Sequence, residues 1–156
     1  MSLAAHKGML NRTWDVSKPN YAASKSLIHH SSIARILHCV MVKNSFTLVS
    51  QLNKWRPTLK DIKVLSTTLM EEFAMTTAAE KAKAANDDYV THSIYFIRDA
   101  LFFCKFEKSV SIADAGGVMR VLKYWVLAFR GAGQHNYARE CVKVIIQTKY
   151  EMTDVL

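Results

Sequence analysis

The chain has 156 residues, of which 50% are hydrophobic and 22% charged, and its formal net charge is +8. This length is about one domain, and the composition is typical of a globular protein and excludes general disorder. The apolar runs fall far short of the roughly 20 residues of a membrane span, and the start, MSLAAHKGMLNRTW, lacks a secretory signal. We therefore expect an intracellular protein without a membrane partner, with the nucleus as one candidate location.

The cysteines, glycines and prolines point to a helical protein without disulfides. Cys39, Cys104 and Cys141 are odd in number, widely spaced and set among apolar residues. A secreted disulfide-rich domain has an even and denser set, so we interpret these as reduced core thiols. Only five glycines and two prolines interrupt the chain, and strand-like alternation is nearly absent. The sequence therefore predicts an all-α fold, a single helical bundle of five or six helices.

The positive charge is unevenly distributed. Residues 1–76 hold 10 Lys and Arg against 4 Asp and Glu, a balance of +6, whereas residues 77–156 hold 11 against 9, a balance of +2. A basic surface attracts nucleic acid or anionic lipid through counterion release and long-range steering. The alternative is that the protein is simply basic, as many soluble proteins are.

The first half predicts an arm and three helices. Residues 1–23 have no clear periodicity, so we expect a poorly ordered N-terminal arm ahead of a single helical domain over 24–156. A first helix is predicted over about 23–41 from one apolar stripe, and a shorter helix in SFTLVSQLNKW ends before Pro57. The next helix opens after Thr58, whose hydroxyl can cap it. The stripe of the first helix consists of Ile33, Ile36, Leu37 and Val40.

The second half predicts three more helices. The alanine-rich segment 78–87 either continues the third helix or acts as a linker, and it divides the domain into halves 24–76 and 87–152. Asp87 or Asp88 can cap the fourth helix. The fifth, from about 113 to 129, is apolar almost all round, which is typical of the centre of a bundle.

The last two helices meet at a glycine-containing corner. Gly131 is placed to end the fifth helix as its left-handed residue, and Asn136 to cap the sixth. The side chains expected to point inward from the sixth helix are Tyr137, Cys141, Val144, Ile145 and Thr148.

A basic segment is the candidate nucleic-acid site. Lys54, Trp55 and Arg56 precede Pro57, and Lys60 and Lys63 follow it at a spacing that makes them neighbours on one helix surface. An aromatic ring among positive charges can meet phosphates. The plainer interpretation is an ordinary exposed surface, since lysine and tryptophan are common on helices.

No catalytic, metal or cofactor site is predicted. The stretch GAGQHN opens a helix and so resembles an anion site, but it lacks the lysine and hydroxyl of a phosphate loop and reads as a corner. The zinc spacings CxxC and HExxH and the hydrolase motif GxSxG do not occur. Glu140 is the most notable carboxylate, although a helix-dipole role with an ion pair to Lys143 is the better explanation when Glu140 is taken alone.

The second half also carries a set of ordered motifs. They are Arg98-Asp99, Ala113-Asp114-Ala115-Gly116-Gly117, Trp125, Phe129-x-Gly131-x-Gly133 and Asn136-Tyr137-Ala138-x-Glu140, the last being the most specific. In this order, from Asp87 to about Glu151, the chain resembles the C-terminal helical part of a domain-of-unknown-function family numbered sixty-five eighty-nine. That family occurs in fungi and some animals and is associated with transposable elements. Its turn reads Gly-Asp-x-Gly-Arg, so Ala113 replaces the first glycine and Gly117 the arginine.

The resemblance implies a relation to transposases. If larger members carry a nuclease core in their strand-rich segment, Asp114 or Glu140 would supply a late acidic metal ligand. This chain has no strand-rich region, so we expect a catalytically inactive helical remnant that binds nucleic acid non-specifically through its basic front half. The alternative is a protein-interaction module that assembles with itself or with a larger relative. Such a module would expose apolar surface, for which the candidates are Tyr89, Tyr95, Phe102, Phe103 and Phe106.

Overall fold

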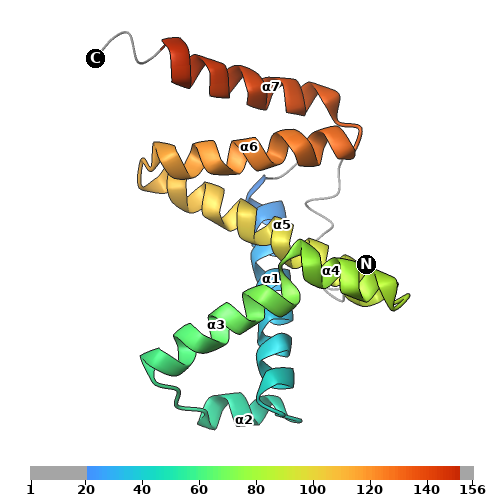
Figure 1. The fold of residues 1–156 in the computed structure, drawn as a ribbon. Helices are drawn as coiled ribbons and strands as arrows, with labels where there is room; N and C mark the ends of the chain where they lie inside the picture. Colours follow the sequence, from blue (N-terminus) through green and yellow to red (C-terminus); the bar gives the residue numbers. More distant parts are fainter. Residues whose placement is uncertain (1–20, 152–156) are drawn as a thin grey trace. The chain divides into compact units, whose positions relative to one another are not determined.

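The computed structural model describes residues 21–151, and over this range the chain is helical without a strand (Figure 1). The elements are α1 (Tyr21–Lys43), α2 (Val49–Lys54), α3 (Leu59–Phe73), α4 (Thr76–Ala84), α5 (Asp88–Ser111), α6 (Ala115–Gly131), α7 (His135–Ile146) and a π-helical turn η2 (Gln147–Glu151). The all-α prediction is confirmed for the described residues. Seven α-helices replace the five or six expected, because the alanine-rich segment forms the separate helix α4.

The chain divides into two compact units, and the division falls within α5. The first unit spans Met1–Leu101 and the second Phe102–Leu156. The alanine-rich segment, which was expected to separate two halves, therefore lies inside the first unit. The single domain over 24–156 stays a prediction. The arm expected over 1–23 lies outside the described residues, except that 21–23 form the start of α1.

The first unit has a thin core, to which α5 contributes three of six buried apolar residues. Its buried apolar side chains are Val40, Ala74, Ala79, Ile94, Ile97 and Ala100. In the stripe predicted for α1 only Val40 is buried, whereas Ile33 is 54% and Leu37 44% exposed. That part of the prediction is wrong, because helical spacing places residues on one face but does not supply an element to cover it. The α3 helix has no buried residue at all.

Two of the predicted helix starts have the expected chemistry. The Thr58 hydroxyl oxygen accepts a hydrogen bond from the Asp61 backbone N–H at 3.2 Å, and the Asp61 carboxylate accepts one from the Thr58 N–H at 2.9 Å. This reciprocal pair is a capping box at the start of α3. At the start of α5, the Asp87 carboxylate accepts from the Val90 N–H at 2.9 Å, so Asp87 rather than Asp88 is the cap.

Four helices end in the same type of turn. After α1, α4, α5 and α6 the chain places one residue in the left-handed region, at φ 55°, 57°, 55° and 72°. Each of these residues donates its N–H to a carbonyl three positions back, and the next residue donates to one five positions back. This pattern is the Schellman motif. The four left-handed residues are Ser45, Asn86, Ala113 and Gly133.

The corner between α6 and α7 differs from the prediction at both ends. Gly131 is the last residue of α6, and Gly133 is the left-handed residue instead, because that position lies two residues beyond the helix. The α7 helix begins at His135 after Gln134, so Asn136 is not its cap. The Asn136 side-chain oxygen accepts a hydrogen bond from the Arg139 guanidinium at 3.4 Å instead.

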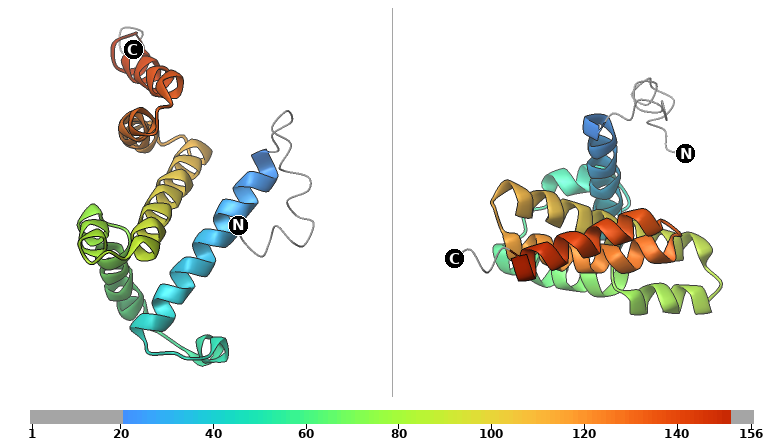
Figure 2. Two further views of the ribbon diagram at one scale, coloured as in Figure 1. Left: turned by 90° about the vertical axis from the view of Figure 1, so that its right-hand side faces the viewer. Right: turned by 90° about the horizontal axis from the view of Figure 1, so that it is seen from above.

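The second unit packs α6 against both its neighbours. The α6 and α7 helices lie side by side (Figures 1 and 2). From α5, Phe102 stacks on Tyr124 of α6, and Phe106 contacts Trp125 of α6 with tilted rings. Its buried residues include Val121, Leu122, Ala138 and Cys141. α6 is therefore the middle helix of this unit. It is not buried all round as predicted, since Leu127 is 73% exposed.

Candidate functional site

The basic turn, which we define as Lys54, Trp55, Arg56, Lys60 and Lys63, lies where α2 passes into α3. Its four cationic side chains are exposed, and Trp55 is half-buried. Within the part of the chain that the structure describes, none of the four cations forms an ion pair. All five residues thus lie at or near the α2–α3 connection of the first unit, with their four cations open to solvent.

Two members of the basic turn also hold it in shape. The Arg56 guanidinium donates to the backbone carbonyls of Asn53 at 2.7 Å and Trp55 at 3.0 Å. It thereby satisfies free carbonyls at the C-terminus of α2, where the helix dipole is negative. The Trp55 ring meets Phe46 edge to face, with centroids 6.2 Å apart. Lys54, Lys60 and Lys63 are thus the cations most available to a partner.

A single carboxylate, that of Asp61, interrupts the positive charge. Its pKa is lowered, first by the hydrogen bond from the Thr58 hydroxyl and then by the one from the Thr58 backbone. Asp61 therefore remains ionised while it caps α3. Residues 44–70 contain four cationic side chains and this one anion, a local balance of +3.

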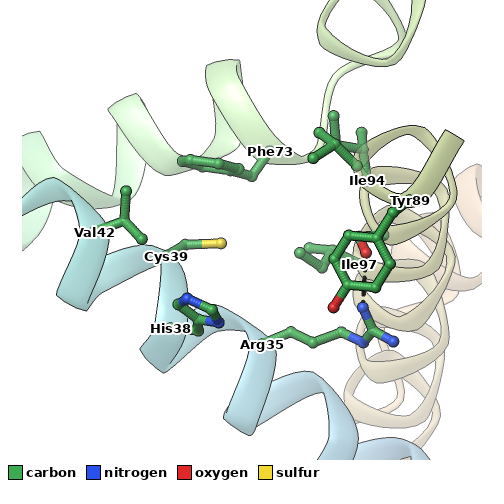
Figure 3. Close-up of a pocket in the computed structure, with 10 residues that line it drawn as sticks. Arg35, His38, Cys39, Val42, Phe73, Tyr89, Ile94 and Ile97 are labelled. Atoms are coloured by element: carbon green, nitrogen blue, oxygen red, sulfur yellow. Dashed lines mark hydrogen bonds between the residues drawn. The ribbon is translucent and has the colours of Figure 1, made fainter. Parts of the chain in front are cut away.

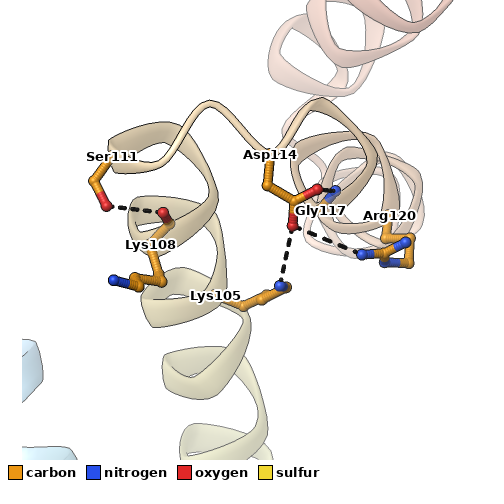
Figure 4. Close-up of polar contacts among 6 residues, drawn as sticks. All are labelled: Lys105, Lys108, Ser111, Asp114, Gly117 and Arg120. Carbon is orange, nitrogen blue, oxygen red and sulfur yellow. Dashed lines mark hydrogen bonds and ion pairs between the residues drawn. The ribbon is translucent and has the colours of Figure 1, made fainter.

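The motif residue Asp114 lies at the start of α6 within a polar cluster of the second unit (Figure 4). One carboxylate oxygen accepts from the Gly117 N–H at 2.8 Å, and the other lies 3.4 Å from the Lys105 ammonium and 3.8 Å from the Arg120 guanidinium. The Gly117 hydrogen bond is the main cause that lowers the Asp114 pKa, and the two cations lower it further. Asp114 is thus an ionised helix cap.

Two further residues of the motif, Ala113 and Gly117, lie around this cap. Ala113 occupies the left-handed position of the turn. Gly117 is buried, and a Cβ built there would overlap the Ser109 hydroxyl and the Asp114 carboxylate. The Ser109 hydroxyl itself is buried without a hydrogen-bond partner. A side chain at position 117 therefore requires Ser109, Asp114 or the helix itself to shift. Gly116 has space for a Cβ at ordinary contact distances.

The aromatic motif residues form one row. Ring centroids are 4.8 Å apart between Phe106 and Trp125, 6.0 Å between Trp125 and Phe129, and 5.5 Å between Phe129 and Tyr137. Tyr137 is 61% exposed, so its predicted inward position is wrong, and Ala138 is buried in its place. Together with the Gly131–Gly133 corner, these residues connect α5, α6 and α7 within the second unit.

The structure places Glu140 in an ion pair and buries, at least in part, the thiols of Cys39 and Cys141. The Glu140 carboxylate is exposed and paired with the Lys143 ammonium at 2.8 Å. Burial raises the pKa of the Cys39 and Cys141 thiols, which keeps them protonated and weakly reactive. Among residues 21–151, no group of three or more His, Cys, Asp or Glu side chains could hold a metal ion.

A third feature, a cavity in the first unit, was not predicted from the sequence. It has a volume of about 200 Å³ and lies between α1, α3 and α5 (Figure 3). Arg35, His38 and Cys39 line it from α1, and Phe73 and Tyr89 from α3 and α5. The only signal for this site was an arginine within the apolar run IARILHCV, which reads equally well as part of an exposed helix face.

The comparisons with known proteins identify the family. The family of unknown function (DUF6589) matches residues 1–156, so the chain belongs to this family. The match covers the whole sequence, whereas the resemblance noted from the motifs covered only residues 87–151. Searches of curated proteins and of solved structures gave no significant match. Within the described helices, none is long and apolar enough to cross a membrane.

Proposed function

We propose that this protein binds nucleic acid non-specifically through the basic turn and is not catalytic. The observation that supports this function is the exposure of Lys54, Lys60 and Lys63 without an ion-pair partner among the described residues. Asp114 and Glu140, the acidic residues of the family motif, are engaged as a helix cap and in an ion pair. A transposase-related origin and a nuclear location belong to the same proposal.

Binding of this kind rests on phosphate contacts. Each phosphate neutralised by a lysine or arginine releases condensed counterions, so the logarithm of the binding constant falls by about 0.9 per contact for each tenfold rise in salt. Such contacts position a protein on the backbone and carry little sequence information. Lys60 and Lys63, one helical turn apart on α3, would reach neighbouring phosphates, while Trp55 would contribute only its exposed part.

The test is a fluorescence-anisotropy salt titration with a labelled DNA duplex. The double variant Lys60→Ala/Lys63→Ala should bind more weakly at low salt, and its salt slope should fall by about two ions. The matched control is Lys81→Ala/Lys83→Ala. It removes the same charge from exposed lysines of α4 that have no ion-pair partner among the described residues.

The control Lys81→Ala/Lys83→Ala should keep a steeper salt dependence of binding than Lys60→Ala/Lys63→Ala. If both variants lose the same slope, binding follows net charge and the basic turn is not the contact surface. If the wild type does not bind at about 50 mM salt, where phosphate contacts are strong, the whole proposal fails.

One observation favours a second candidate, a protein-interaction module that assembles with itself or with a larger relative. Large apolar residues of α3 are exposed, namely Leu59 at 69%, Val64 at 60%, Met70 at 48% and Ile62 at 47%. Of the exposed aromatics expected for this module, Tyr89 is 76% exposed, whereas Phe102 and Phe106 are packed on α6. Light scattering over a concentration series tests it. Association that Ile62→Glu abolishes would support it, and a monomer at every concentration would exclude self-assembly.

A further inference from the structure

Arg35 is a half-buried cation without a carboxylate partner in the described structure. Its guanidinium donates to the Ser93 hydroxyl at 2.9 Å and lies over the Phe96 ring, 4.9 Å from its centroid. Both partners are neutral, and no ion pair to Arg35 exists among residues 21–151. The guanidinium is a rigid fork of donors whose geometry matches a carboxylate. It lines the 200 Å³ cavity of the first unit, so the cavity offers an anion a positively charged wall (Figure 3).

A second cavity adjoins this one and is apolar. It has a volume of about 170 Å³, and Cys39, Phe73 and Ile97 line both cavities. The remaining wall of the second cavity consists of Ile36, Ser66, Leu69, Met70, Ala74 and Leu101. The only hydroxyl among them, that of Ser66, already donates to the Lys63 carbonyl at 2.8 Å. An apolar cavity of about 150 Å³ is large enough for a molecule the size of benzene, so the second cavity has room for one.

We propose that the first unit binds a small monocarboxylate that carries a benzene-sized apolar group. The carboxylate pairs with Arg35 beside the Ser93 hydroxyl, and the apolar group fills the cavity around Leu69 and Leu101. A carboxylate suits this site better than a phosphate, because Arg35 is the only permanent cation on either cavity wall. The Glu72 carboxylate, which precedes Phe73 in the sequence, is paired with the Lys43 ammonium at 2.7 Å and not with Arg35. The site is separate from the basic turn, so this inference does not depend on nucleic-acid binding.

The experiment titrates the full chain with 3-phenylpropionate and follows backbone amide shifts by NMR. We expect saturable binding with a dissociation constant of about 1 mM or tighter, and shifts centred on Cys39, Phe73 and Ile97. Two comparison ligands test the carboxylate and the phenyl ring of 3-phenylpropionate separately. The neutral 3-phenyl-1-propanol lacks the charge and acetate lacks the ring, so each should bind at least about tenfold more weakly.

Two variants separate the two cavities. Arg35→Gln should weaken 3-phenylpropionate at least about tenfold and remove the preference for acid over alcohol. Leu69→Phe places a larger side chain in the apolar cavity alone and so fills part of it. It should weaken the binding of both phenyl ligands and leave the binding of acetate unchanged. Both variants are compared with the wild type by far-UV circular dichroism.

Several results would overturn the proposal. They are a wild-type chain that does not saturate by about 10 mM, equal affinity for the acid and the alcohol, and shifts located away from the cavities. If Arg35→Gln does not fold, the comparison of ligands on the wild type and on Leu69→Phe decides the question without it.

Discussion

Replacing Gly117 with alanine tests the tightest contact in the second unit. Gly117 is buried in the first turn of α6, and its N–H donates to the Asp114 carboxylate at 2.8 Å. A Cβ at this position would lie 2.8 Å from the Asp114 carboxyl carbon and would overlap the Ser109 hydroxyl even more closely. Because Ser109 belongs to α5 and Asp114 to the turn, the added methyl group requires both side chains to rotate away or α6 to move.

The expected loss of stability follows from two opposing effects. Overpacking by one methyl group costs about 1–3 kcal/mol, and with two groups in the way we expect the upper value. Alanine inside a helix recovers about 1 kcal/mol relative to glycine. The free energy of unfolding should therefore fall by about 2 kcal/mol. At Gly116 the nearest atoms to an added Cβ are 3.5 and 3.6 Å away, so Gly116→Ala should be neutral or stabilising by up to about 1 kcal/mol.

The assay is urea unfolding followed by the fluorescence of Trp125, in a background where Trp14 and Trp55 are phenylalanine. Trp125 lies between Phe106 and Phe129 and so reports on the second unit. Adding Ser109→Ala to Gly117→Ala should recover part of the loss, because it removes one of the overlapping atoms. The same effect for alanine at 116 and at 117, in sign and size, would refute the steric argument.

Three further predictions concern the turns and caps. Ala113→Gly should stabilise the second unit by about 0.5–1 kcal/mol, since a left-handed alanine costs about 1–2 kcal/mol and added chain entropy offsets part of that gain; a lower urea midpoint would contradict it. Asp114→Asn should keep the cap but flatten the fall of thermal stability in acid. Because the Asp114 pKa is lowered in the folded state, its contribution to stability is present above about pH 4 and is lost as the pH falls through the folded pKa. If wild type and variant have the same melting profile between about pH 2 and 6, this prediction is contradicted. Thr58→Ala should destabilise the first unit by about 1 kcal/mol, measured by circular dichroism against Thr67→Ala on the exposed face of α3, and equal losses would argue against the capping box.

The features that the sequence predicted correctly depend on neighbouring residues. Thr58 and Asp61 cap α3 within four positions of each other, and Asp87 caps α5 through the third residue after it. The ends of helices were harder, because the left-handed residue lies two positions beyond a terminus whose place depends on the whole helix. Thus the sequence predicted Gly131 as the left-handed residue, whereas the structure has Gly133 in that position. Ala113 was not predicted to be left-handed, since alanine rarely adopts that conformation.

The features that the sequence missed depend on contacts between distant segments. The spacing of Ile33 and Leu37 showed that they share a face, but whether a face is buried depends on what covers it. The part of Trp55 that is open to a ligand depends on Phe46, which comes from another turn. Arg35 is a candidate binding residue only because Ser93 and Phe96 of α5 contact it at the edge of a cavity. None of these contacts leaves a periodic or local signal.

The motif residues and the residues of the two proposed binding sites lie in different units. The turn at Asp114, the aromatic row through Trp125 and the Gly133 corner all determine how α5, α6 and α7 pack in the second unit. The basic turn and the Arg35 cavity belong to the first unit. Changes in the motif should therefore alter the stability of the second unit while nucleic-acid and carboxylate binding persist. A motif variant that folds but has lost either binding activity would show that the second unit contributes directly to that site.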